Sequence, residues 1–329
     1  MPFSGRIRYD RRVSQSFLDH FRKGGVAHSL TEYAAKARFP VDLQMRHSPK
    51  TGADHASFYV GLTSVLNVVA KNKPVPSLAL TAHKTWSEGK FGFDASWGTA
   101  APVDAWFPRW IDVEEYLEKV VPSASVDFGQ TEGAVQAAAS AFSDGSRVML
   151  DREVTPHFLN KTVKESVLRP LSKGLADALA KAKPVPGTPP ASFGSECDLL
   201  ALDRDGRLLA VEVKPSVSSL VWTPAQATMY SKILQAWVSD DSGDSPGWRA
   251  VVLGMLEQRR QLGLAPRFRV ELPDELVVVP VIAVQRGASG KLLARLWQMQ
   301  HALLDAGVGD PALEVYQVSL SGRLDRLHA

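Results

Sequence analysis

The sequence predicts an α/β protein in which a mixed sheet is flanked by helices and follows an N-terminal α+β region. In the C-terminal half, helical and strand patterns alternate in the order helix, strand, strand, helix, strand. The strand patterns are nearly continuous apolar runs, which is typical of strands covered on both faces. The length of 329 residues exceeds the usual size of a single domain. We therefore expect an accessory domain at 1–150, for nucleic acid or a partner, and a second domain at 151–329.

The accessory region contains short strand patterns and one helical pattern. We expect strands at 56–61, 77–81 and 90–96 and a helix at 113–121. Four of the eight tryptophans (Trp86, Trp97, Trp106 and Trp110) fall within this region. Aromatic side chains beside lysine and arginine can stack on bases, but such a cluster is more often the core of a small domain. We expect the core.

The second region has a clearer order of elements. A helical pattern at 160–183 contains Pro170, which predicts either a kink or a break between two helices. A loop rich in proline follows at 183–190. Two strand patterns then flank an Asp-Gly turn. The expected order is strand 197–203, strand 208–214, helix 224–238, helix 248–262, strand 276–284, a further helix and strand 313–320.

Composition excludes several classes of protein. Cys197 is the only cysteine, which rules out an intrachain disulfide framework and a multi-cysteine zinc site, and fits a reducing cytoplasm. The first twenty residues lack an apolar signal core. The longest apolar run, at 276–284, is too short to span a membrane, so we expect no membrane association. No P-loop motif is present, so any motor would be a partner protein.

Basic residues offer two candidate tracks for phosphates. The net charge is only +3, but residues 1–60 hold ten Lys and Arg against five Asp and Glu. Such an excess can follow a phosphate backbone or can form an ordinary solvated surface. The same two interpretations apply to the second set, which contains Arg259, Arg260, Arg267 and Arg269.

The chemistry of the chain is concentrated on the two strands around the Asp-Gly turn. Asp198, Glu212 and Lys214 interrupt otherwise apolar strands. A charged group in such a place is costly unless it is paired or bound to metal. Two adjacent carboxylates repel each other, and a divalent cation such as Mg²⁺ or Mn²⁺ removes that repulsion. Lys214 lies two residues after Glu212 and therefore shares its face of the strand.

The length of the turn decides whether this site exists. A two-residue loop at 205–206 would set Asp198 opposite Val213 and point its side chain away from Glu212. A three-residue loop at 204–206 sets Asp198 opposite Glu212, on one face. Gly206 stands where such a loop needs a left-handed residue. We therefore predict the three-residue loop with Gly206 at positive φ.

Asp198 followed by Glu212-Val213-Lys214 resembles the core of the PD-(D/E)xK nuclease superfamily. Helix, hairpin with Asp, Glu-x-Lys and helix is the order of that family, although Cys197 replaces the proline that often precedes the aspartate. The resemblance covers about residues 155–285. It implies a restriction-endonuclease-like core and a divalent metal held by Asp198, Glu212 and the Val213 carbonyl.

Further residues extend the resemblance to the RecB-like branch. Gln226 and Tyr230 match its Gln-x-x-x-Tyr motif and lie one helical turn apart. The family's preceding helix often adds an acidic metal ligand, here Glu165, and some members add a histidine, here His157. A competing interpretation takes Thr223 and Gln226 as a capping box and Tyr230 as a core aromatic.

The resemblance implies a metal-dependent nuclease that hydrolyses DNA, including single strands or ends, in repair, restriction or phage defence. A helicase or a defence-system component is the expected protein partner. Two alternatives stay open. In the first, the fold serves only to bind nucleic acid or protein, and in the second, the enzyme acts on RNA.

Overall fold

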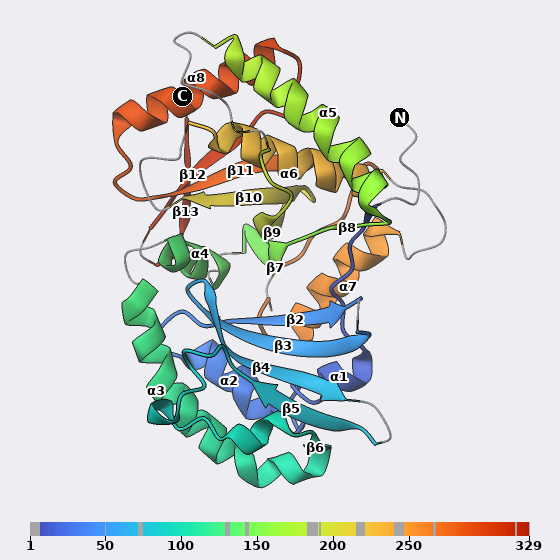
Figure 1. Cartoon of the computed structure of the whole chain (residues 1–329), viewed down its shortest axis with the longest axis vertical. Coiled ribbons are helices and arrows are strands. Elements are labelled where there is room, and N and C mark those ends of the chain that lie inside the picture. The colour runs from blue at the N-terminus through green and yellow to red at the C-terminus, as the bar shows by residue number, and fades with distance from the viewer. Residues whose placement is uncertain are drawn as a thin grey trace. The chain divides into compact units, whose positions relative to one another are not determined.

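A computed structural model of the chain describes residues 7–49, 51–71, 75–128, 132–141, 145–182, 190, 192–214, 221–239, 247–265, 268–319 and 321–328. The proline-rich loop expected at 183–190 lies almost wholly outside these residues. The chain is a mixed α/β protein whose sheets are flanked by helices (Figure 1). No helix in the described part has the length and apolar character needed to cross a bilayer.

The chain divides into two compact units that are not contiguous in sequence. Unit 1 contains Met1–Tyr9, Phe142–Leu253 and Arg267–Ala329, and unit 2 contains Asp10–Ala141 and Gly254–Pro266. The boundary expected at 150 falls inside strand β7 (Arg147–Val154). Strand β7 belongs to unit 1 because it pairs with β9 (Cys197–Asp203). The assignment of β7 to this unit therefore depends on long-range pairing and not on local sequence.

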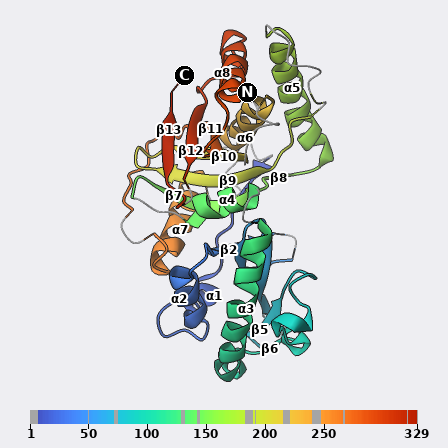
Figure 2. The ribbon, with the colours of Figure 1, turned by 90° about the vertical axis from the view of Figure 1, so that its left-hand side faces the viewer.

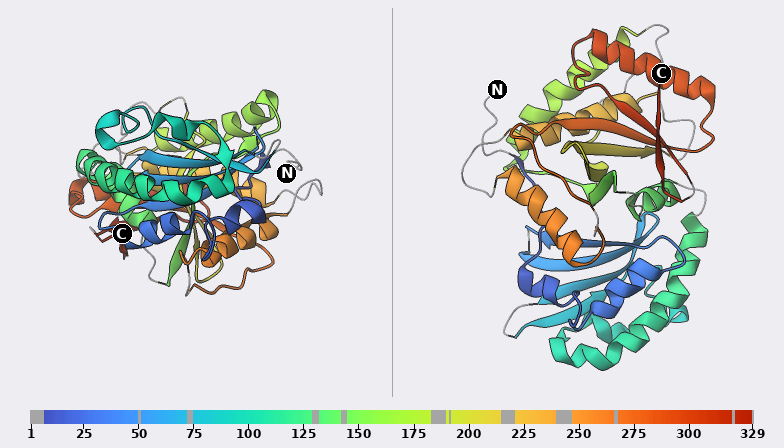
Figure 3. Two further views of the ribbon diagram at one scale, coloured as in Figure 1. Left: turned by 90° about the horizontal axis from the view of Figure 1, so that it is seen from below. Right: turned by 180° about the vertical axis from the view of Figure 1, so that it is seen from behind.

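Unit 2 is built on a five-stranded antiparallel sheet in the order β2-β3-β4-β5-β6. Helices α2 and α3 pack against this sheet and against each other (Figures 2 and 3). The elements are α1 (Gln15–Asp19), α2 (His28–Lys36), β2 (Asp42–Ser48), β3 (Ala53–Val60), β4 (Thr63–Lys71), β5 (Ser77–Thr81), β6 (Ala101–Pro102), α3 (Trp110–Phe128) and α4 (Glu132–Ala141).

The aromatic cluster of unit 2 is a core, as predicted. Its four tryptophans (Trp86, Trp97, Trp106 and Trp110) are all buried. The strand expected at 90–96 is wrong, because the segment forms two short 3-10 turns, Gly89–Phe91 and Ala95–Gly98. These turns bring rings together edge to face, as Phe93 and Trp97 show at a centroid distance of 5.1 Å. Packing between aromatic rings has overridden the strand pattern here.

Unit 1 is built on a six-stranded mixed sheet in the order β13-β12-β11-β10-β9-β7. Strands β7, β9 and β10 are antiparallel, whereas β10, β11 and β12 are parallel. The elements are β1 (Ile7–Arg8), β7, β8 (His157–Phe158), α5 (Lys161–Ala180), β9 (Cys197–Asp203), β10 (Leu208–Lys214), α6 (Thr223–Val238), β11 (Val278–Gln285), α8 (Gly290–Asp305), β12 (Glu314–Val318) and β13 (Leu324–Leu327). Helix α7 (Trp248–Gln261) is divided between the units, with its residues up to Leu253 in unit 1 and the rest in unit 2.

Helices α5, α6 and α8 contact one another, and α6 packs on β10 and β11. A buried apolar cluster joins Ala227 of α6 to Ile282 and Val284 of β11 and to Leu296 of α8. Gln235 of α6 also ties the helix to the sheet, because its side chain accepts a hydrogen bond from the Val278 amide at 2.9 Å. Helix α5 runs unbroken through Pro170, so the break between two helices is not formed.

The turn between β9 and β10 has three residues, which confirms the predicted register. Leu208 pairs with Leu202 and Val211 pairs with Leu199, so the strands close over residues 204–206. Gly206 has a φ of +77°, as the turn requires. Its amide donates to the Asp203 carbonyl at 3.1 Å and completes the turn.

We predict that Gly206→Ala destabilises the fold more than Gly287→Ala does. Both glycines have positive φ, which costs a side chain about 1–3 kcal/mol. A Cβ at Gly206 would also lie 2.7 Å from the Glu271 carbonyl oxygen, whereas a Cβ at Gly287 would meet nothing within 4 Å. Urea denaturation of both variants measures the difference, and equal losses of stability would contradict the close packing at this turn.

Candidate functional site

The register of the sheet gathers the charged residues on the side that α6 covers. Glu212 pairs with Ile282 and Lys214 pairs with Val284 in the parallel ladder of β10 and β11. Ile282 and Val284 belong to the cluster that packs on α6. Paired residues share a face of the sheet, so Glu212 and Lys214 point toward α6. Continuing the register of β9 by one pair sets Asp198 opposite Glu212.

Glu212 and Lys214 form a buried ion pair. Their side chains are only 4% and 11% exposed, and Lys214 Nζ lies 2.7 Å from Glu212 Oε1. Such burial of two charges costs several kcal/mol each, and their mutual attraction offsets that cost only when the geometry is close. The pair therefore gives Glu212 a compensating positive charge from the chain itself.

Asp198 lies where the ladder between β9 and β10 ends. The last pair of that ladder is Val211 with Leu199. Beyond it, the Val213 amide donates to Asp198 Oδ2 at 2.7 Å. In an antiparallel pair, the N–H and C=O of one residue face the same neighbouring strand. The Val213 carbonyl therefore points toward the Asp198 side of β10.

Tyr230 of α6 comes close to the same carboxylates. It is 6% exposed. Burial raises the pKa of its hydroxyl far above the usual range, and the negative charges of Glu212 and Asp198 raise it further. The hydroxyl therefore stays protonated and can donate a hydrogen bond. Gly194 makes room for it, because a Cβ there would lie 3.0 Å from the Tyr230 oxygen.

Gln226 lies one turn before Tyr230 on α6 and is partly exposed. The capping box considered from the sequence is not formed, because Trp222 is the N-cap residue and its side chain makes no cap hydrogen bond. Thr223 is instead the first residue of the helix, followed by Pro224. Gln226 therefore does not cap α6, which was the main structural alternative to a functional role for this residue.

The structure shows Glu165 on an exposed part of α5. Its side chain is 54% exposed and forms an ion pair with Lys161 one turn earlier on α5, at 3.7 Å. The buried face of α5 is instead apolar, with Val167 and Leu175. His157 lies in β8, where it pairs with Arg8 of β1. Among the residues that the structure describes, no metal-binding group of side chains joins either residue to Asp198 and Glu212.

The remaining oxygen ligands are of the type that a hard divalent cation binds. Asp198 and Glu212 supply carboxylate oxygens and Val213 supplies a carbonyl oxygen, which are the ligands that Mg²⁺ and Mn²⁺ take in proteins. Across the part of the chain that the structure describes, no three His, Cys, Asp or Glu side chains gather as a metal-binding group. Two carboxylates suffice for Mg²⁺, which usually keeps several waters.

Two residues beside the site were not identified from the sequence. Cys197 is fully buried, and burial together with the charges of Asp198 and Glu212 raises the pKa of its thiol. Its Sγ donates to the Leu199 carbonyl at 3.1 Å, so it is a structural residue of β9. Gly194 is the second, with a φ of +85°. No spacing rule predicts it, because its role depends on the contact with Tyr230.

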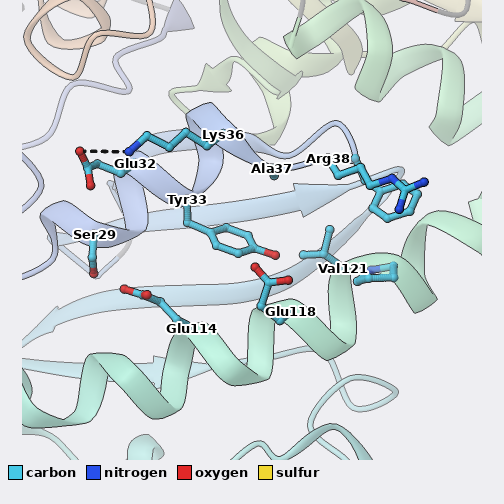
Figure 4. A pocket seen from close by; sticks show the side chains of 11 residues that line it. Ser29, Glu32, Tyr33, Lys36, Ala37, Arg38, Glu114, Glu118 and Val121 are labelled. Atoms are coloured by element: carbon cyan, nitrogen blue, oxygen red, sulfur yellow. Dashed lines mark ion pairs between the residues drawn. The ribbon is translucent and has the colours of Figure 1, made fainter.

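A pocket of about 550 Å³ lies in unit 2 and contains none of these residues. It is lined by α2, α3 and the segment after α2 (Figure 4). Glu32 and Lys36 form an ion pair at its edge, at 3.4 Å. The Tyr33 hydroxyl points toward Glu118, and burial with that charge raises the pKa of Tyr33 to about 12. Its lining has mixed charge and no metal-ligand pattern.

Comparison with known proteins finds no matching family model, no matching curated protein and no matching solved structure. Function is therefore inferred from the residues of this chain. The fold is α/β with sheets flanked by helices, and the charged residues on β9, β10 and α6 form its candidate site.

We predict that Lys214→Met destabilises the protein by about 3 kcal/mol, because it leaves Glu212 buried without its counter-charge. The double variant Glu212→Gln/Lys214→Met should recover part of that loss. Lys173→Met is the control, because Lys173 forms a 2.8 Å ion pair whose partners are exposed, and it should change little. Chemical denaturation measures all three, and equal effects of the two lysine variants would contradict the buried pair.

Proposed function

We propose that the chain is a metal-dependent phosphodiesterase that hydrolyses DNA, with its site on β9, β10 and α6. The observation that carries the proposal is the convergence of Asp198, Glu212 and Lys214 at one place on two adjacent strands. The β9–β10 register and the face shared with α6 support it. Three charged groups gathered at the end of the hairpin away from its turn, where the neighbouring strand residues are apolar, favour a functional role.

We further propose that unit 1 has the restriction-endonuclease-like core of the PD-(D/E)xK superfamily, in its RecB-like branch. The chain order supports this, because α5 precedes the β9–β10 hairpin and α6 follows it. The charge of Glu212 raises the pKa of the Tyr230 hydroxyl, and this electrostatic link between α6 and β10 supports the Gln-x-x-x-Tyr assignment for Gln226 and Tyr230.

Asp198, Glu212 and the Val213 carbonyl would hold Mg²⁺ or Mn²⁺. When bound, such a cation polarises a phosphate oxygen and lowers the pKa of a bound water. Lys214 supplies a fixed positive charge beside Glu212, which can hold the attacking water or offset charge that develops on the phosphate. The protonated Tyr230 hydroxyl can donate to a phosphate oxygen.

One observation favours a second candidate, a module that binds nucleic acid or protein without cleaving it. Lys214 already compensates Glu212, and the Val213 amide already engages Asp198, so the carboxylates have partners without a cation. Metal-dependent cleavage separates the two candidates. Parallel DNA and RNA substrates separate a deoxyribonuclease from a ribonuclease.

We predict that Asp198→Asn, Glu212→Gln and Lys214→Met each lower Mn²⁺-dependent cleavage of DNA by about 100-fold or more. Asp205→Asn is a matched control, because Asp205 lies in the same hairpin with a side chain that is 77% exposed. Glu165→Gln should also keep full activity, since Glu165 stays on the surface of α5. Full activity in any two of the three site variants would reject the assignment.

We also predict that Mg²⁺ or Mn²⁺ raises the melting temperature of the wild-type protein by mass action. Binding at a concentration 100 times Kd stabilises the folded state by about 2.7 kcal/mol. Asp198→Asn should reduce the shift, and Asp205→Asn should not. Differential scanning fluorimetry with and without EDTA measures it. The absence of both a shift and cleavage would favour the binding module.

A further inference from the structure

The pocket between α2 and α3 in unit 2 has the size of a small-molecule site. Its volume of about 550 Å³ lies within the range of about 300–1,000 Å³ that is usual for such sites. Figure 4 shows Ser29 and Glu114 on its left, Tyr33 and Glu118 in the middle and Val121 on its right. The polar side chains therefore gather in one part of the pocket, and an apolar surface continues beyond them.

Two carboxylates on the α3 wall of this pocket have no counter-charge. Glu114 and Glu118 are four residues apart, so they lie on neighbouring turns of the same helix face. Neither forms an ion pair with any residue that the structure describes. No lysine or arginine stands three or four residues from either of them, so α3 itself offers no partner. Like charges at this spacing destabilise a helix, and the two glutamates therefore do not serve the stability of α3.

The basic residues that line the pocket are engaged elsewhere. Lys36 pairs with Glu32 on its own helix at 3.4 Å. Arg38 is exposed, and its guanidinium carbon lies 5.9 Å from the centre of the Phe39 ring. Neither cation forms an ion pair with the two carboxylates of α3 in the described structure. The negative charge on the α3 wall is therefore open to a cation that comes from outside.

Two hydroxyl groups on the α2 wall lie across the pocket from these carboxylates (Figure 4). The Ser29 hydroxyl oxygen is buried and has no hydrogen-bond partner among the residues that the structure describes. The Tyr33 hydroxyl, one helical turn later, also forms no hydrogen bond with a described residue. Its pKa is raised to about 12 by burial and by the charge of Glu118, so it stays protonated. Buried polar groups nearly always have a partner, so these hydroxyls point to a ligand in the pocket.

We propose that this pocket binds a primary amine with a short apolar body. The ammonium group donates hydrogen bonds to Glu114, to Glu118 and to a hydroxyl oxygen of Ser29 or Tyr33. An ammonium group has three donors and one positive charge, so it matches a set of acceptors that carries negative charge. The apolar body extends along Val121. The inference goes beyond the proposed function, because the pocket belongs to unit 2 and uses no residue of the candidate site.

The test is isothermal titration calorimetry of the full chain with hexylamine, at neutral pH in phosphate buffer with EDTA. Hexylamine should bind saturably. The neutral analogue 1-hexanol should bind about tenfold more weakly or less, because it lacks the charge that strengthens each hydrogen bond to a carboxylate. A capped peptide with one central lysine carries the same ammonium group on a protein chain. Its affinity relative to hexylamine distinguishes a lysine of a partner protein from a free amine as the source of this group.

Glu118→Gln should weaken hexylamine binding by about tenfold, because it replaces a hydrogen bond to a charged carboxylate with a neutral one. Glu115→Gln is the matched control. Glu115 is also an exposed glutamate of α3, but it does not line the pocket, so this variant should keep the wild-type affinity. The melting temperature of Glu118→Gln should not fall below that of wild type, because the substitution removes a repulsion and breaks no ion pair of the described structure.

Three results would each overturn the proposal. The first is that wild type binds neither hexylamine nor the lysine peptide. The second is an equal affinity for hexylamine and 1-hexanol, which would show that the charge is not recognised. The third is an equal effect of Glu118→Gln and Glu115→Gln, which would show that the amine binds to the acidic surface of α3 and not in the pocket. The experiment does not depend on the nuclease, because binding is measured without metal and without DNA.

Discussion

The register between β9 and β10 is the constraint on which the candidate site depends. Side chains alternate along a strand, so a shift of one residue would move Asp198 to the other face and leave Glu212 without it. The three-residue turn closed by Gly206 fixes that register. Because the added Cβ of any other residue would meet the Glu271 carbonyl, close packing outside the hairpin reinforces the choice of glycine. The geometry of the turn at one end of the hairpin therefore decides which charged side chains meet at the other end of β9 and β10.

Electrostatic compensation follows from that register. The strands bury Glu212 to 3% exposure, and such a charge persists only with a close partner. Lys214, two residues later on the same face, is that partner at 2.7 Å. The site is therefore ready without a cation, and a divalent ion would bind by competing with the lysine for Glu212. In the proposed nuclease, a cation bound to Glu212 would release Lys214, which would then be available to the substrate.

The sequence predicted the bounds of helices and strands most accurately where a single local pattern determines them. Both site strands and β5 have the expected bounds, because mainly apolar runs ended by turn residues leave little choice. The segment 90–96 failed because its aromatic rings pack on one another across 3-10 turns, a tertiary preference with no local signature. The membership of β7 depends on pairing with β9, and the exposure of Glu165 depends on which face of α5 the fold buries. A family pattern supplied Glu165, but the helix places it at the surface.

A charged binding surface is harder to predict from sequence than the candidate site. A basic residue can attract a negatively charged partner only when the fold leaves it exposed and without an acidic neighbour. The N-terminal excess of basic residues fits a phosphate track or a solvated surface, and two of its members, Arg12 and Arg22, have acidic partners within a few residues. On α5, for example, Lys161 pairs with Glu165 and Lys173 pairs with Asp177, because residues four apart in a helix are neighbours. An excess of charge is therefore a property of a face, and that face exists only after the chain has folded.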